Sequence, residues 1–199
     1  MNRIENDYWD KYFNILGLDE AGRGACAGPI VIAGVILPKN YENNLIKDSK
    51  QLSLKQRENI YQIIVKDALF YEIIILDNLY VDLNNPKQTS IDGMEKICNK
   101  LKNKCDLIIT DFEKLNIDYI KQINLIKGDQ KSINVAAASI LAKVTRDKIM
   151  LNYHNLYPQY HFDKHKGYGT KLHLEKIKIH GICPIHRLSY KNIKNLLFS

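Results

Sequence analysis

Several short, continuous apolar runs along this chain predict buried strands. Residues 30–37 consist of aliphatic residues and one glycine and end at Pro38, which is typical of a strand covered on both faces. Residues 15–19 form a similar run, and we expect the two runs to pair as antiparallel strands joined through the glycine-rich turn between them. Three further runs predict strands over residues 70–76, 106–111 and 123–129, the last two ending in an aspartate.

Helices are predicted where apolar residues recur at intervals of three and four. One predicted helix begins at the capping box Ser53–Gln56, and a second covers residues 94–101. A third runs from about residue 133 to Tyr157, where Pro158 stops it, and a fourth lies between Thr170 and Gly181. In the longest of them Ala137, Ile140, Leu141 and Val144 form the inner stripe. The basic residues Lys143, Arg146 and Lys148 are expected to lie away from that stripe.

Composition favours one class of binding partner and argues against structural zinc and membrane insertion. Lys and Arg number 29 against 22 Asp and Glu, a net charge of +7, which favours a polyanionic partner, although many basic proteins have none. The four cysteines are scattered without zinc-ligand spacing, so we expect reduced thiols and no structural zinc. No apolar run approaches the ~20 residues of a membrane span, and residues 1–12 lack a signal-peptide core. We expect a soluble, cytoplasmic protein without membrane contact.

The stretch from Gly17 to Gly24 places two adjacent acids, Asp19 and Glu20, at the end of a predicted strand. Successive residues of a strand point to opposite faces, so the two acids share a site only if the chain bends or twists there. Gly22 and Gly24 supply that freedom. The alternative is an ordinary solvated transition from strand to loop.

Four carboxylates stand at predicted strand ends, without histidine or cysteine beside them: Asp19, Glu20, Asp111 and Asp129. Each alone is also explained as a turn former or a helix cap. Together, oxygen-only ligands suit Mg²⁺ or Mn²⁺, and such a set bridges two ions ~3.5–4 Å apart for attack of water on a phosphodiester. With the excess of basic residues, the pattern predicts a metal-dependent phosphodiesterase that acts on nucleic acid.

A series of motifs in fixed order then resembles the ribonuclease HII family, from Ile15 to about Ser189. The motifs are residues 19–24 (DEAGRG), 28–29 (GP), 48–53 (DSKQLS), 110–111 (TD), 127–129 (KGD), 137–147 (AASILAKVTRD) and 165–170 (HKGYGT). The resemblance implies an α/β, ribonuclease H-like fold: a mixed five-stranded sheet with helices on both faces and a helical C-terminal part. It also implies a catalytic domain over residues 1–157 and a C-terminal helical extension over 158–199 that carries the tyrosine loop, the two forming one compact unit.

The same resemblance implies an endonuclease that cleaves the RNA strand of RNA–DNA hybrids and cuts 5′ to single ribonucleotides in duplex DNA. The implied products carry 3′-hydroxyl and 5′-phosphate ends, and the implied roles are removal of ribonucleotides from DNA and of RNA primers. Two divalent ions, Mg²⁺ or Mn²⁺, take part, and the nucleic acid is bound by a monomer.

Residue roles follow from the resemblance position by position. Asp19, Glu20, Asp111 and Asp129 are the implied metal-binding catalytic acids. The backbone of Gly22, Arg23 and Gly24 senses the ribose 2′-hydroxyl, and Tyr168 stacks on the neighbouring deoxyribose. Further expected substrate contacts, each also explicable as a surface or packing residue, are Ser49, Lys50, Lys143, Arg146, His165 and Lys166. Asp147 is expected to be a structural ion-pair partner or a surface residue.

Three alternatives remain at this point. A ribonuclease HIII-like hybrid nuclease has an additional N-terminal substrate-binding domain, which we do not expect because the acidic motif begins at residue 19. A junction resolvase of the same fold does not need the Gly-Arg-Gly segment together with the tyrosine loop. A non-catalytic hybrid-binding module gains nothing from clustered negative charge where phosphates dock.

Overall fold

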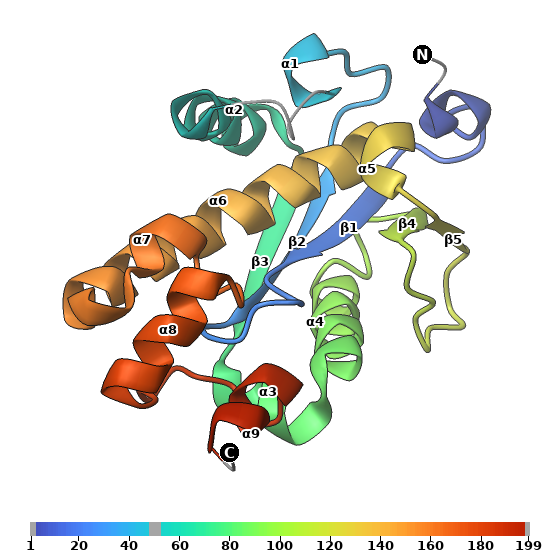
Figure 1. Ribbon diagram of the computed structural model, residues 1–199. Helices are drawn as coiled ribbons and strands as arrows, with labels where there is room; N and C mark the ends of the chain where they lie inside the picture. The colour runs from blue at the N-terminus through green and yellow to red at the C-terminus, as the bar shows by residue number, and fades with distance from the viewer. Residues whose placement is uncertain (1–2, 48–52, 198–199) are drawn as a thin grey trace.

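A mixed five-stranded sheet forms the centre of the computed structural model, which describes residues 3–47 and 53–197 (Figure 1). The strands lie in the order β3-β2-β1-β4-β5. Their bounds are β1 (Ile15–Ala21), β2 (Ile30–Ile36), β3 (Phe70–Leu76), β4 (Leu107–Asp111) and β5 (Gln122–Leu125). β2 pairs antiparallel with β1 and β3, whereas β4 pairs parallel with β1 and β5. The predicted mixed sheet and the predicted antiparallel pair are both confirmed.

The parallel pairing of β1 with β4 brings two of the predicted acids to one edge of the sheet. Leu18 pairs with Thr110, and each of these residues directly precedes an acid, Asp19 in β1 and Asp111 in β4. Since parallel strands end at the same edge, the two carboxylates are neighbours although they lie far apart in the sequence.

Helices cover both faces of the sheet (Figure 1). Alternate residues of β2 point to opposite faces, so each face has apolar side chains that a layer of helices buries. On one face Val31 and Val35 pack with α2 (Leu54–Asp67) and α6 (Ile133–Leu156). On the other, Ile32 and Ile36 pack with α4 (Pro86–Lys100). The remaining helices are η1 (Ile4–Asp7), α1 (Asn44–Lys47), α3 (Asn78–Asn84), α5 (Gly128–Lys131), η3 (Pro158–Tyr160), α7 (Phe162–His165), α8 (Lys171–His180) and α9 (Lys191–Leu197).

The helix termini follow the predicted capping signals. Ser53 caps α2, with its hydroxyl accepting from the Gln56 amide and its own amide donating to the Gln56 side chain. α6 ends just before Pro158, and Thr170 caps α8. One predicted strand end is wrong: β5 stops at Leu125, and Asp129 lies in the first turn of the short helix α5.

The C-terminal segment packs on the loop that follows β1 and on α6. Tyr160, Phe162 and Ile185 are buried in one cluster with Ala27 and Met150. The same loop forms single β-bridges with this segment, Ala25 with Tyr168 and Ala27 with His186. The division of the chain at residue 157 stays a prediction. Within the described residues, no helix has the length and hydropathy needed to span a membrane.

Candidate active site

Three carboxylates interact through their charges at the edge where β1 and β4 end. Asp19 is buried, and its pKa is raised well above the ordinary value, first by burial and then by Glu20 and Asp111. Burial also raises the pKa of Glu20 to about 7, although Arg23 opposes this shift. The cluster is therefore costly when fully ionised, and a cation would relieve that cost.

Asp19 and Glu20 both lie within β1, and their side chains project from different sides of the strand. Asp19 is hydrogen-bonded by Ser139 of α6 and accepts a hydrogen bond from the Glu20 amide at 2.7 Å. Glu20 instead lies 3.6 Å from the guanidinium of Arg23. The strand runs on to Ala21, and the chain turns only at Gly22, which has φ +96°.

The short helix α5 carries Asp129 and also contacts Asp111. The Gly128 amide donates to Asp111 Oδ1 at 2.7 Å, and Asp129 is the next residue, 9% exposed. Among the described residues, no three His, Cys, Asp or Glu side chains already form a metal-binding group. The donor chemistry nevertheless fits a hard divalent cation, because the set offers only carboxylates and Glu20 Oε2 is buried without a hydrogen-bond donor.

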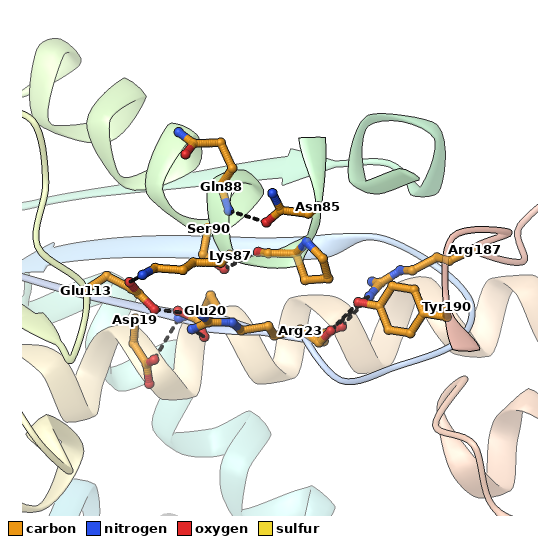
Figure 2. A network of polar contacts seen from close by, with 12 residues as sticks. Asp19, Glu20, Arg23, Asn85, Lys87, Gln88, Ser90, Glu113, Arg187 and Tyr190 are labelled. Carbon is orange, nitrogen blue, oxygen red and sulfur yellow. Dashed lines mark hydrogen bonds and ion pairs between the residues drawn. The ribbon is translucent and has the colours of Figure 1, made fainter. Parts of the chain in front are cut away.

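A buried acid that the sequence analysis missed, Glu113, holds Arg23 in place (Figure 2). Glu113 Oε1 lies 2.7 Å from Arg23 Nη2, and Lys87 Nζ lies 4.0 Å from the other carboxylate oxygen. Glu113 lies two residues after Asp111, in a loop that has no hydrophobic periodicity. The only signal for it in the sequence is that a second acid stands close to the end of a predicted strand. Between them, Phe112 is 60% exposed and has φ +69°.

A cleft of about 460 Å³ lies beside the acids. Glu20, the segment Gly22–Gly24, Ser139, Lys143 and Tyr168 line it. A Cβ added to Gly22 would lie 2.0 Å from Arg146 Nε, so a side chain there would collide with the protein. A Cβ on Gly24 would lie 4.0 Å from the Tyr168 ring, in open contact. The structure thus brings the predicted sugar-sensing segment and the predicted stacking tyrosine to one cleft.

Two expected substrate contacts are corrected. Arg146 is fully buried, and its guanidinium donates to the carbonyls of Pro29, Lys166 and Ala27 at 2.9–3.0 Å. It therefore supports the loop after β1 and has no donor facing a phosphate. His165 is also buried: its Nε2 is bonded to the Tyr160 carbonyl and its Nδ1 accepts from the Gly167 amide. Both residues act within the protein.

The remaining expected contacts have different placements. Lys143 lines the cleft and forms an ion pair with Asp147 at 2.5 Å, which confirms the structural reading of Asp147. Lys166 is partly buried and donates to the Asp163 carbonyl. Ser49 and Lys50 lie outside the described residues.

Comparison with known proteins agrees with this geometry. The profile of the family described as Ribonuclease HII matches residues 16–193. Ribonuclease HII of Mycoplasma mycoides subsp. mycoides is 50% identical over 181 residues, covering 90% of this chain and 87% of the relative. That of Endomicrobium trichonymphae is 46% identical, covering 98% and 93%.

Solved structures show the same fold. The crystal structure of ribonuclease H2 from Pyrococcus horikoshii is similar with a TM-score of 0.75 at 26% identity, covering 92% of this chain and 96% of that one. A ribonuclease HIII in complex with Mn²⁺ has a TM-score of 0.69 at 21% identity, covering 93% and 69%, and shows the fold alone. The chain belongs to the ribonuclease HII family, and it is a hydrolytic endonuclease of the ribonuclease H type.

Proposed function

We propose that this endonuclease cleaves the RNA strand of RNA–DNA hybrids and cuts 5′ to single ribonucleotides embedded in duplex DNA. One observation carries the proposal: Glu20, which belongs to the acid cluster at the ends of β1 and β4, lines the same cleft as Gly22–Gly24 and Tyr168. This common cleft supports a site that combines phosphate chemistry with recognition of a sugar. The proposed products carry 3′-hydroxyl and 5′-phosphate ends.

Asp19, Glu20, Asp111 and Asp129 would hold Mg²⁺ or Mn²⁺ in this proposal. The bound ions supply an activated water and neutralise charge on the phosphate that is attacked. The protein orients the carboxylates: the Glu20 amide fixes one oxygen of Asp19, and the Gly128 amide fixes one oxygen of Asp111. Since the pKa values of Asp19 and Glu20 are raised, bound cations would favour the ionised form of these carboxylates.

Sugar selection rests on the two sides of the cleft. On one side, the missing side chain at Gly24 lets the sugar approach the backbone closely, so that the amides of the segment can bond the 2′-oxygen that distinguishes ribose from deoxyribose. On the other side, the Tyr168 ring is 38% exposed and lies 5.4 Å from the Arg146 guanidinium carbon, which supports it from behind. We propose that this ring stacks on the neighbouring deoxyribose.

The proposed substrates also suggest the cellular roles of the enzyme. We propose roles in removing misincorporated ribonucleotides and RNA primers, performed by a cytoplasmic monomer. The net charge of +7 supports binding to a polyanionic duplex, and we propose that Lys143, which lines the cleft and pairs with Asp147, contacts a phosphate.

The test is cleavage of a DNA duplex that contains one ribonucleotide, with Mg²⁺ or with Mn²⁺ and with analysis of the product ends. Asp111→Asn is expected to lower kcat about 10³-fold, because the metal site contributes several kcal/mol to the transition state. Asp118→Asn, which changes an exposed acid outside the cluster, is the matched control. Wild-type protein that binds the duplex without cutting it under either ion would contradict the proposal and favour a binding module.

A further inference from the structure

A second fully buried arginine, Arg187, contacts the Gly22–Gly24 segment, and Figure 2 shows it with Tyr190 close to Arg23. Its Nη1 donates to the carbonyl of Gly22 at 2.8 Å and reaches that of Arg23 at 3.3 Å. Its Nε donates to the Gly28 carbonyl at 2.9 Å. The side chain therefore holds both ends of the loop that follows β1.

Tyr190 completes this arrangement. Arg187 Nη1 donates to the Tyr190 hydroxyl at 2.7 Å, and that hydroxyl in turn donates to the Arg23 carbonyl. The tyrosine ring also lies 5.2 Å from the guanidinium carbon. One arginine–tyrosine pair thus contacts two consecutive carbonyls, those of Gly22 and Arg23, and the Gly22 carbonyl also accepts from the Ala25 amide at 3.2 Å.

The planar trans peptide converts this contact into a constraint on the opposite side. In a trans peptide the C=O and the following N–H point in opposite directions. Holding the Gly22 and Arg23 carbonyls on Arg187 and Tyr190 therefore turns the amides of Arg23 and Gly24 away from that pair. Within the part of the chain that the structure describes, neither amide donates a hydrogen bond to the protein.

The chemistry of Arg187 agrees with a role in orienting backbone. None of the ion pairs among the described residues involves Arg187, and its Nη2 is buried without an acceptor. Burying an arginine without a carboxylate costs free energy that only its neutral acceptors offset. What it provides in return is a rigid planar fork with fixed donor directions.

We propose that Arg187 and Tyr190 are positioning residues that set the peptide planes of Gly22–Gly24, so that the amides of Arg23 and Gly24, which donate to none of the described residues, present a paired donor to a ribose oxygen of the substrate. The inference deepens the proposed function and rests on it. Neither residue touches the substrate in this account. Both act through the backbone, and their loss should affect discrimination between sugars more than general affinity for duplexes.

Tyr190→Phe is the informative variant, because it removes only the hydroxyl and keeps the ring. The measurement is the ratio of dissociation constants for an all-DNA duplex and the same duplex with one ribonucleotide, in Ca²⁺ to prevent turnover. We expect this ratio to fall about tenfold, as one backbone constraint on the amide donors is lost. Tyr153→Phe is the control, since Tyr153 packs in the C-terminal cluster without contacting the segment.

The outcomes separate the two proposals. An unchanged ratio in Tyr190→Phe, or equal weakening for both duplexes, overturns the positioning role while leaving the cleavage activity of the wild type intact. Wild-type protein that fails to cleave the ribonucleotide duplex in Mg²⁺ and Mn²⁺ overturns the proposed function and this inference with it. Melting temperatures of the two variants within a few degrees of each other exclude a general loss of folding as the cause.

Discussion

Arg23 Nη2 and Glu113 Oε1 lie 2.7 Å apart and join the loop after β1 to the loop after β4. The glutamate side chain is 2% exposed and the arginine side chain 34%. Arg23 also faces Glu20 at 3.6 Å, so its charge is balanced within the protein. The side chain at the centre of the Gly22–Gly24 segment therefore pairs with the protein's own acids, which is consistent with the proposal that the backbone of this segment contacts the substrate.

A double-mutant cycle with Arg23→Ala and Glu113→Ala measures this contact. We expect a coupling free energy of about 1–2 kcal/mol by urea unfolding, because the glutamate is desolvated while the arginine keeps some contact with water. The exposed pair Lys100–Glu72, at 3.0 Å with side chains 53% and 32% exposed, is the control and should couple by less than about 0.5 kcal/mol. Equal coupling in the two pairs would contradict the importance of burial.

Glu5 fastens the N-terminal segment to the start of α6. Its buried carboxylate accepts from the Ser132 hydroxyl at 2.5 Å and from the amide and side chain of Asn134 at 3.1 and 3.2 Å. Glu5→Ala leaves these donors without an acceptor and should lower the free energy of unfolding by about 2–3 kcal/mol. Asp7→Ala, an exposed acid in the same short helix, should change it by less than about 0.5 kcal/mol.

Phe112 occupies a left-handed conformation that costs a bulky residue about 1–2 kcal/mol. Its side chain is 60% exposed, so little packing offsets that cost. Phe112→Gly relieves the strain, but the greater freedom of glycine stabilises the unfolded state by roughly 0.5–1 kcal/mol. We expect the folded state to be stabilised by about 0.5–1 kcal/mol in total. Thermal unfolding beside Phe112→Ala, which keeps the backbone strain, tests the balance, and a less stable glycine variant would contradict it.

A buried histidine pair should make stability depend on pH. His173 Nε2 and His186 Nε2 are 3.1 Å apart, and burial lowers their pKa values to about 3 and about 4. Unfolded histidines titrate near 6.5, so the unfolded state takes up protons first as pH falls. The contribution of the pair is present above about pH 6.5 and is lost as pH falls towards 4.

The raised pKa values of Asp19 and Glu20 make metal-free protein more stable as pH falls, which opposes the effect of the histidine pair. The histidine effect is therefore measured as a difference in stability between variants. Between pH 7 and pH 5, wild-type protein should lose about 1–2 kcal/mol more stability than His173→Gln. His180→Gln, which changes an exposed histidine in the same helix, should follow the wild type. Parallel curves for all three proteins would exclude the pair as the source.

Local patterns in the sequence predicted most of the scaffold. Continuous apolar runs marked the strands, and capping residues such as Ser53 and Thr170 marked helix starts, because these signals depend on neighbours within a few positions. The adjacency of Asp19 and Asp111 followed from their places at strand ends. Parallel pairing, which no local pattern specifies, then made them neighbours.

Two of the errors have a common physical origin. Arg146 is expected to lie away from the inner stripe of its helix, yet backbone carbonyls far away in the sequence satisfy its guanidinium. His165 is buried through local contacts instead, with the Tyr160 carbonyl and the Gly167 amide. Glu113 was missed because its partner Arg23 lies in a different loop. Polar groups buried by long-range contacts leave no periodic trace, so only the folded structure reveals them.

The loop after β1 is held by residues far away along the chain. Arg146 of α6, the bridge at Tyr168 and the side chain of Arg187 all contact residues 22–29. Asp19 and Asp111, in contrast, are brought together by the pairing of β1 with β4. Loss of the C-terminal contacts would therefore withdraw support from the loop and leave the two acids adjacent on the sheet.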